Sequence, residues 1–262
     1  MSVAVNDFYP NLGTSLPGGN SLNFAVQTAK LGMRASFVGA LGSDDMGKRI
    51  KKILQNRNID SSRLHFAQGP TASNILRIRE DGERYSLPED WHGNAYQDFR
   101  ISDKDWAFIN GHQALMITAY DPNFDSFLNK KNPSSYATVD FLDSPKIEFL
   151  EQTAPYLSAL FFNAPPEFGQ EILPLSEKYA ALFIHTSDAL GSSVYYKGKK
   201  YTQKAIPVEI VIDTTGCGDT FHSSFTVAYL RGNTLPECLE FAAKQASFRL
   251  AHFGGIELNN GE

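Results

Sequence analysis

The stretch Asp213-Thr214-Thr215-Gly216-Cys217-Gly218-Asp219 lies between a short apolar run, residues 208–212, which we expect to form a strand, and a segment with helical periodicity. Two glycines at a strand-to-helix turn allow backbone N–H groups to converge at the helix N-terminus, where they bind an anion without a positive side chain. If the anion is a γ-phosphate, Asp219 can accept the proton of an attacking hydroxyl group while the amides stabilise the transferred charge. Alternatively, Asp219 only complements the helix dipole and the glycines only form a tight turn.

A second glycine pair, Gly18 and Gly19, precedes Asn20 and Asn23 at the start of an amphipathic segment. Paired glycines let the backbone approach a small polyol, and asparagine amides offer both a donor and an acceptor to its hydroxyl groups. The alternative is an ordinary loop with an asparagine at a helix start. Two more glycine motifs follow in order: Gly39-Ala40-Leu41-Gly42-Ser43-Asp44-Asp45-Met46-Gly47 and Gly69-Pro70-Thr71-Ala72.

Together these four motifs resemble those of the ribokinase-like (PfkB-type) carbohydrate kinases, and they span nearly the whole chain. The resemblance implies an ATP-dependent sugar kinase in which Asp219 is the catalytic base. It also implies that the amides of Gly216, Cys217 and Gly218 form an anion hole. Cys217 stands where the family usually has alanine, and this small-for-small change leaves a backbone amide site intact.

The resemblance also implies a sugar site and two kinds of cation. The order Asp7-x-Tyr9-Pro10, then Gly18-Gly19-Asn20-x-x-Asn23, is most similar to fructoselysine 6-kinases, which phosphorylate the 6-hydroxyl of a fructose–amine conjugate. ATP and Mg²⁺ are the implied cofactors, and the family's monovalent cation, K⁺, would map to Asp213 and Thr215. The implied substrate-binding residues are Asp7, Gly18, Gly19, Asn20 and Asn23.

The sequence departs from the family pattern in three places. Asn163 and Glu167, the candidates for ordering magnesium-bound water, lie one residue further apart than in the family's N-x-x-E. The nucleotide segment contains Thr186, Asp188 and Gly191, and Asp188 replaces a glycine, so its charge is expected to weaken ATP binding. Before Asp7 only residues 2–6 are available for a first strand, so we expect this strand to be short or missing and the aspartate to be weakly anchored.

Short apolar runs alternate with helical segments, which predicts one α/β domain over residues 1–262 with a mostly parallel central sheet. The resemblance makes this a ribokinase-like three-layer sandwich. Residues 71–87 predict two strands joined at Asp81-Gly82, and residues 88–100 read as a loop. With residues 8–17, the segment 68–97 is expected to form a small β-sheet lid. The predicted strands are 36–40, 114–118, 137–141, 160–163 and 181–186, and the predicted helices are 22–31, 46–56, 124–130, 145–154, 168–178, 219–230 and 235–251.

Composition narrows the class of partner. The net charge is −5 and no block of like charge occurs, which argues against nucleic acid and anionic membranes as partners. Two cysteines suggest no disulfide framework, and the first ten residues resemble no secretory signal, so we expect a cytoplasmic protein.

The resemblance further suggests a homodimer that pairs through the lid. The alternatives are a catalytically weak or inactive sugar-binding relative, or a kinase for another ketose, ribose or a nucleoside.

Overall fold

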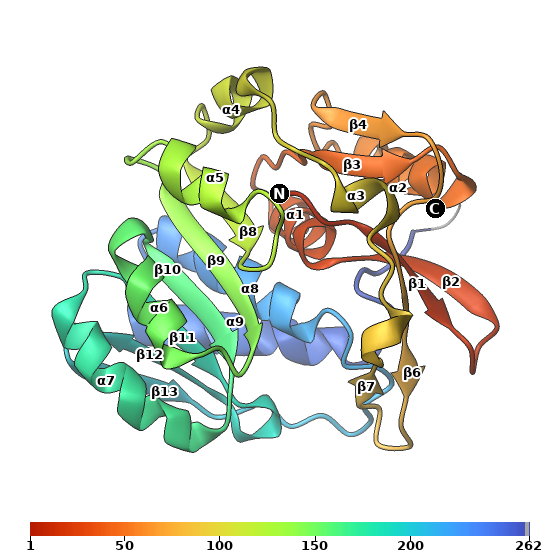
Figure 1. The fold of residues 1–262 in the computed structure, drawn as a ribbon. Coiled ribbons are helices and arrows are strands. Elements are labelled where there is room, and N and C mark those ends of the chain that lie inside the picture. Colours follow the sequence, from red (N-terminus) through yellow and green to blue (C-terminus); the bar gives the residue numbers. More distant parts are fainter. Residues whose placement is uncertain (260–261) are drawn as a thin grey trace. The chain divides into compact units, whose positions relative to one another are not determined.

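A computed structural model describes residues 1–259 and 262 of this α/β protein (Figure 1). Contacts divide the chain into two units, each of which is described by itself. The first unit combines Met1–Ile101, Pro207–Val227 and Gln245–Glu262, and the second combines Ser102–Ile206 and Ala228–Lys244. Among the described residues, no helix has the length and apolar character needed to cross a membrane. The single kinase domain over residues 1–262 stays a prediction.

The second unit contains a six-stranded sheet in the order β13-β12-β11-β10-β9-β8. Strands β8 to β11 run parallel to one another, and β12 and β13 add an antiparallel edge. The parallel strands are almost continuously apolar because both faces are covered. Their bounds confirm four predicted strands to within two residues: β8 Ala114–Thr118, β9 Tyr136–Asp143, β10 Ala159–Asn163, β11 Leu182–Thr186, followed by β12 Ser192–Tyr196 and β13 Lys199–Gln203.

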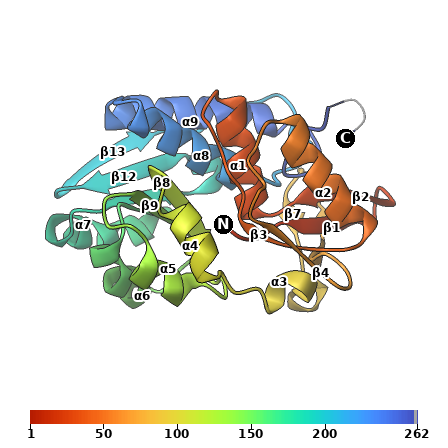
Figure 2. The same cartoon turned by 90° about the horizontal axis from the view of Figure 1, so that it is seen from above.

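Helices cover both faces of this sheet (Figure 2). Phe141 of β9 contacts Phe124 and Phe149, which belong to the helices on one face. Tyr136, five residues earlier and therefore on the opposite face, contacts Tyr229. The helices that contribute to this unit are α4 Asp103–Ile109, α5 Phe124–Lys130, α6 Ile147–Thr153, α7 Gly169–Lys178 and parts of α8 Cys217–Leu230 and α9 Leu235–Arg249.

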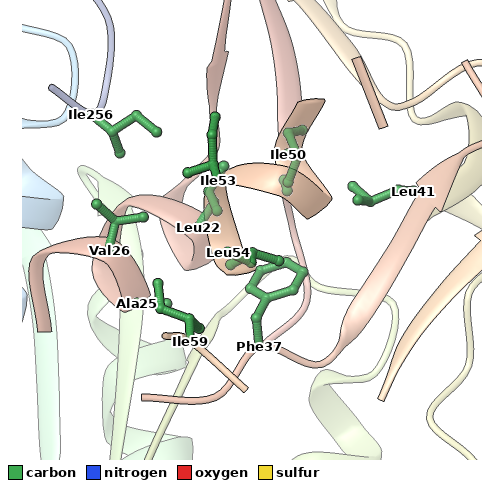
Figure 3. Packing of buried hydrophobic residues seen from close by; sticks show 11 residues of the cluster. Leu22, Ala25, Val26, Phe37, Leu41, Ile50, Ile53, Leu54, Ile59 and Ile256 are labelled. Atoms are coloured by element: carbon green, nitrogen blue, oxygen red, sulfur yellow. The ribbon is translucent and has the colours of Figure 1, made fainter. Parts of the chain in front are cut away.

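The first unit holds a three-stranded sheet in the order β2-β1-β5 and two strand pairs, β3-β4 and β6-β7. Strand β1 is central: it pairs antiparallel with β2 and parallel with β5. Leu22 and Val26 on one helix, Ile50 and Ile53 on the next, and Phe37 from the segment between these helices belong to one buried cluster (Figure 3). The elements are β1 Val5–Tyr9, β2 Thr14–Gly18, α1 Asn20–Lys30, β3 Gly39–Gly42, α2 Asp45–Asn56, β4 Leu64–Ala67, β5 Ser73–Ile75, β6 Arg77–Ile78, β7 Arg84–Tyr85 and α3 Asn94–Gln97.

Several local predictions are wrong. Residues 208–212 form no strand, and the strand predicted at 36–40 is displaced to β3, with Ser36 in an isolated bridge to Asp60. Only β6 and β7 form the hairpin at Asp81-Gly82, because the first part of the predicted pair, β5, joins β1 instead. Residues 88–100, read as a loop, contain a 3₁₀ turn and the short helix α3.

The anchoring predicted for Asp7 is also wrong. Its strand lies in the middle of a sheet, where Asp7 is opposite Leu16 on one side and Asn74 on the other, and the side chain is buried. The first strand starts later than expected and includes the aspartate. Strand β1 is held by pairing with β2 and β5, which lie further along the chain. The few residues before Asp7 gave no indication of this pairing.

Candidate functional site

The carboxylate of Asp219 lies in the first turn of α8 and is only 7% exposed. Each of its oxygens accepts a hydrogen bond from an asparagine of α1: Asn20 Nδ2 lies 3.0 Å from Oδ1 and Asn23 Nδ2 lies 2.7 Å from Oδ2. Asparagines three residues apart reach the same carboxylate because they share one face of a helix. The structure therefore brings together three residues from motifs that are almost 200 positions apart in the sequence.

Burial raises the pKa of the Asp219 carboxyl group, and the hydrogen bond from Asn23 and the charge of Arg84 oppose this shift. Asn23 Oδ1 is buried and accepts no hydrogen bond from the described residues. It lies against Gly255, where any Cβ would meet the Asn23 side chain at 2.3 Å. A carboxylate with a raised pKa, next to an amide oxygen that has no donor, is suited to receive both a proton and a hydroxyl group.

Asp7 lies on β1 against the glycine pair. A Cβ at Gly18 would meet Asp7 Oδ2 at 2.0 Å, so only glycine leaves room for this carboxylate. Gly19 has φ +101 and packs against the backbone of Ala4, a conformation that glycine adopts without strain. Burial raises the pKa of Asp7 to about 7; the charge of Arg84 lowers it, and the nearby aspartates raise it further.

The glycine turn has one tight and one open position. Gly216 has φ +78, and a Cβ there would meet the carbonyl oxygen of Gly255 at 2.6 Å, whereas a Cβ at Gly218 would meet nothing within 4 Å. The Cys217 thiol donates to the carbonyl oxygen of Ala246 at 3.8 Å, and burial raises its pKa to about 12. The thiol is thus directed to a carbonyl group and is poorly ionised. The backbone amide of Cys217 donates to the carbonyl oxygen of Thr214 at 3.2 Å, so an anion in the turn would compete with that oxygen for it.

Asp213 is fully buried and holds the segment before the turn. Its Oδ1 accepts from Thr215 N at 2.8 Å and Thr215 Oγ1 at 2.6 Å, and its Oδ2 accepts from Tyr9 Oη at 3.1 Å and Gly254 N at 2.8 Å. Four donors occupy the two oxygens, and a cation would have to displace some of them. The monovalent-cation role expected of Asp213 and Thr215 does not fit this arrangement.

The β6-β7 hairpin is fastened to the same segment. Gly82 at its turn accepts from Thr214 N at 3.2 Å, and Arg84 N donates to Thr214 Oγ1 at 3.1 Å. A Cβ at Gly82 would meet the backbone of Val211 at 2.6 Å. Sequence reasoning missed Arg84, whose charge influences both Asp7 and Asp219; a lone arginine in a polar hairpin carries no recognisable signal.

The two remaining glycine motifs form a structural node. Asp44 caps α2 by accepting from Gly47 N at 2.9 Å, and it also accepts from Thr71 N at 2.9 Å and Thr71 Oγ1 at 2.6 Å. A Cβ at Gly42 would meet Thr71 N at 2.2 Å, and one at Gly47 would meet the carbonyl oxygen of Gly42 at 2.1 Å. These residues fix backbone positions and form none of the hydrogen bonds described above for Asp219 and Asp213.

In the second unit, the predicted nucleotide and magnesium residues gather at the carboxyl ends of neighbouring strands. Asn163 Nδ2 donates to Asp188 Oδ1 at 3.1 Å and to Asp143 Oδ1 at 3.2 Å, and Thr186 Oγ1 donates to Asn163 Oδ1 at 3.3 Å. Asp188 has φ +46, the left-handed region in which glycine is most at ease. Carboxylate and amide oxygens are the donor chemistry that Mg²⁺ prefers, so this group fits the cation. Sequence reasoning missed Asp143.

Glu167 and Gly191 follow β10 and β11, the strands that end at Asn163 and Thr186. Glu167 is exposed in a 3₁₀ turn after β10, and Gly191 has φ +107 at the end of the turn that starts at Asp188. A Cβ at Gly191 would meet the carbonyl oxygen of Gln203 at 2.2 Å. Only glycine suits this position, and the geometry accounts for that requirement without a ligand.

Comparison with known proteins agrees with the motifs. The sequence profile described as pfkB family carbohydrate kinase matches residues 10–260. The chain belongs to this family. It is accordingly an ATP-dependent carbohydrate kinase. The matched residues include nearly all of both units.

The chain is similar to proteins with different acceptors. It is 26% identical over 253 residues to fructoselysine 6-kinase of Escherichia coli, with 95% of each chain covered. The structure resembles that of Arabidopsis thaliana ribokinase complexed with ribose and ATP, with a TM-score of 0.78, 22% identity and coverage of 96% of this chain and 90% of the other. It also resembles the structure of adenosine kinase from Sinorhizobium meliloti, with a TM-score of 0.82 and 19% identity. This match covers 98% of this chain and 87% of the adenosine kinase chain. The predicted ribokinase-like α/β fold is confirmed.

Proposed function

We propose that this kinase transfers the γ-phosphate of ATP to the primary hydroxyl group of a sugar or sugar–amine conjugate, with the 6-hydroxyl of fructoselysine as the acceptor. The observation that carries the proposal is the pair of asparagine amides, Asn20 and Asn23, held on the carboxylate of Asp219. Similarity to the E. coli fructoselysine 6-kinase over 95% of the chain supports the choice of acceptor.

In the proposed reaction, Asp219 Oδ accepts the proton of the acceptor hydroxyl group, and the raised pKa of this carboxyl group favours that transfer. The amides of Gly216, Cys217 and Gly218 stabilise the charge on the transferred phosphoryl group. Asp7, Gly18, Gly19, Asn20 and Asn23 hold the sugar. The support for this assignment is the space that Gly18 leaves for Asp7 and the acceptor oxygen of Asn23, which no described residue engages.

On the nucleotide side, we assign Thr186, Asp188 and Gly191 to ATP, and Asn163 and Glu167 to the ordering of Mg²⁺ through water. When bound with ATP, Mg²⁺ neutralises charge on the phosphate oxygens. The donation from Asn163 to Asp143 supports a place for this carboxylate beside the cation.

The charge of Asp188 should weaken ATP binding. Replacing Asp188 by glycine removes an exposed negative charge and suits the positive φ, so we expect the KM for ATP to fall about fivefold, the equivalent of roughly 1 kcal/mol of repulsion. The KM for the sugar should not change. Steady-state kinetics with varied MgATP measure both constants, and Asp98→Gly serves as a control at another exposed aspartate. An unchanged KM for ATP would show that the Asp188 side chain points away from the phosphates.

An ATP-consumption screen tests the proposed acceptor. It compares fructose–amine conjugates with free ketoses, ribose and nucleosides, because a ribokinase and an adenosine kinase share this fold. Fructoselysine should give the highest kcat/KM. Preference for ribose or a nucleoside would move the acceptor to another class, and consumption with none of them would favour the sugar-binding relative without turnover.

The segments 8–17 and 68–97 are proposed as the lid, and we propose that two chains pair through it. Several large apolar side chains in these segments are more than a third exposed: Phe8, Leu12, Tyr85, Leu87 and Trp91. Such residues are more often buried at an interface than left in water. Light scattering at micromolar concentration should give the mass of a dimer, and replacing Phe8 and Trp91 by serine should give that of a monomer. A monomeric wild-type protein, with and without sugar, would contradict the pairing.

A cytoplasmic location is also part of this proposal. Cys217 and Cys238 are both free thiols, which agrees with a reducing compartment. ATP as the phosphoryl donor points to the same place.

A further inference from the structure

Arg249 is the last residue of α9 and is 7% exposed. Its guanidinium group donates to backbone carbonyl oxygens. Nε lies 3.4 Å from Thr215 O, and Nη2 lies 2.8 Å from His252 O and 3.0 Å from Phe253 O and also donates to Gly254 O. Within the described part of the chain, no carboxylate forms an ion pair with it. A buried positive charge is thus surrounded by four carbonyl groups.

This guanidinium lies directly beside the glycine turn. Thr215, whose carbonyl it contacts, immediately precedes Gly216, and Gly254, which it also contacts, donates its N–H to Asp213. Carbonyl oxygens around a buried charge are also the donor set that K⁺ prefers. Here that donor set is engaged by a side chain, and the oxygens of Asp213 are engaged by four donors.

We propose that the guanidinium group of Arg249 takes the place of a monovalent cation next to the anion-binding turn, so that this kinase needs no K⁺. The guanidinium holds the Thr215 carbonyl and therefore the orientation of the amides that follow it, and its charge favours an anion in the turn. Arg249 is a positioning residue in this proposal, which rests on the anion-binding role proposed for the turn.

The wild-type protein gives the first test. Its turnover in potassium, sodium and tetramethylammonium chloride at equal ionic strength should agree within about twofold, because ionic strength alone then sets screening. Its melting temperature without substrates should be the same in all three salts, since a cation that binds only the folded state would raise it. Stimulation by K⁺ of about fivefold or more, or a higher melting temperature in K⁺ alone, would overturn the proposal. The melting experiment needs no substrate, so it stands even if the proposed acceptor is wrong.

Variants of Arg249 give the second test. Arg249→Ala should raise the KM for ATP about tenfold or more, the loss expected for a charged hydrogen-bonding group, with a smaller change for the sugar. Added guanidinium or K⁺ at ~20 mM should restore part of the loss, and Arg249→Lys should keep most of the activity because it keeps the charge. The exposed Arg34→Ala is the control and should behave as wild type under every salt.

The outcomes separate a cation role from a merely structural one. A folded Arg249→Ala that binds ATP like wild type, or that neither guanidinium nor K⁺ improves, would contradict the proposal. If Arg249→Ala does not fold, Arg249→Lys gives the answer. A folded lysine variant whose KM for ATP is raised about tenfold or more would show that the positive charge alone is not sufficient. This result would also contradict the proposal.

Discussion

Replacing Asp219 by asparagine should lower kcat by ~10²–10⁴-fold, the usual cost of losing a general base. The amide has nearly the shape of the carboxylate but cannot take the proton of the acceptor hydroxyl. One of the two donors, Asn20 or Asn23, will also face an amide nitrogen instead of an oxygen, so a loss of about 1 kcal/mol in the free energy of unfolding is expected. Sugar affinity should stay within a few-fold of wild type.

Steady-state kinetics and a direct sugar-binding measurement check this prediction. The control is Asp45→Asn, at a fully exposed aspartate in the first turn of α2, which should change neither constant. Turnover of Asp219→Asn close to that of wild type would remove Asp219 from the mechanism and leave it the task of complementing the helix dipole. Loss of sugar binding with an unchanged kcat at saturation would make it a binding residue.

Asp7 should make sugar binding depend on pH. Its pKa of about 7, raised mainly by burial, means that the group is protonated below neutral pH and ionised above it. A hydroxyl donor binds the ionised form better, so the KM for the sugar should fall as pH rises through 7 and should increase by at most about tenfold per pH unit below it. Asp7→Asn should raise the KM ~10- to 100-fold at pH 8 and flatten this profile.

The same shift has a consequence for stability. Because the folded-state pKa of Asp7 lies above the ordinary value of 3.8, the folded protein holds this proton more tightly than the unfolded chain. The contribution to the free energy of unfolding is fully present below pH ~4, declines as pH rises towards 7, and is constant above it. Denaturant unfolding of wild type and Asp7→Asn at pH 5 and 8 measures this decline.

For sugar binding, steady-state kinetics across pH give the test. A KM for the sugar that is constant between pH 6 and 8 would contradict the proposed role of Asp7.

Local patterns were enough to predict much of the fold. Alternating apolar runs located β8 to β11 within two residues, and the helix predicted over 235–251 starts at the first residue of α9, Leu235, where Glu237 accepts from Thr234 N at 2.8 Å. Strands with long-range partners were harder. Strand β1 depends on pairing with β2 and β5, which its own residues do not reveal. Residues 208–212 are mostly apolar, yet they form no strand.

The site was predictable where the chemistry lies in a compact motif. Asn20, Asn23 and Asp219 each stand at a glycine turn, and their positions in the sequence indicated that they could meet a ligand. Arg249 gave no such signal, because an arginine in the last turn of a helix normally complements the dipole. Its role depends on carbonyl groups of a turn 34 residues earlier and of the segment that follows α9. The filled oxygens of Asp213 likewise depend on Tyr9, 204 residues away.

The most direct test follows the phosphoryl group itself. ³¹P NMR of a reaction containing ATP, Mg²⁺ and fructoselysine should show a new phosphomonoester signal, coupled to the protons on C6 of the sugar, that grows as ATP disappears. The same reaction with Asp219→Asn should show at most ~1% of that rate. If ATP is instead hydrolysed to free phosphate, or if the phosphomonoester forms equally fast with Asp219→Asn, the proposed transfer with Asp219 as its base is contradicted.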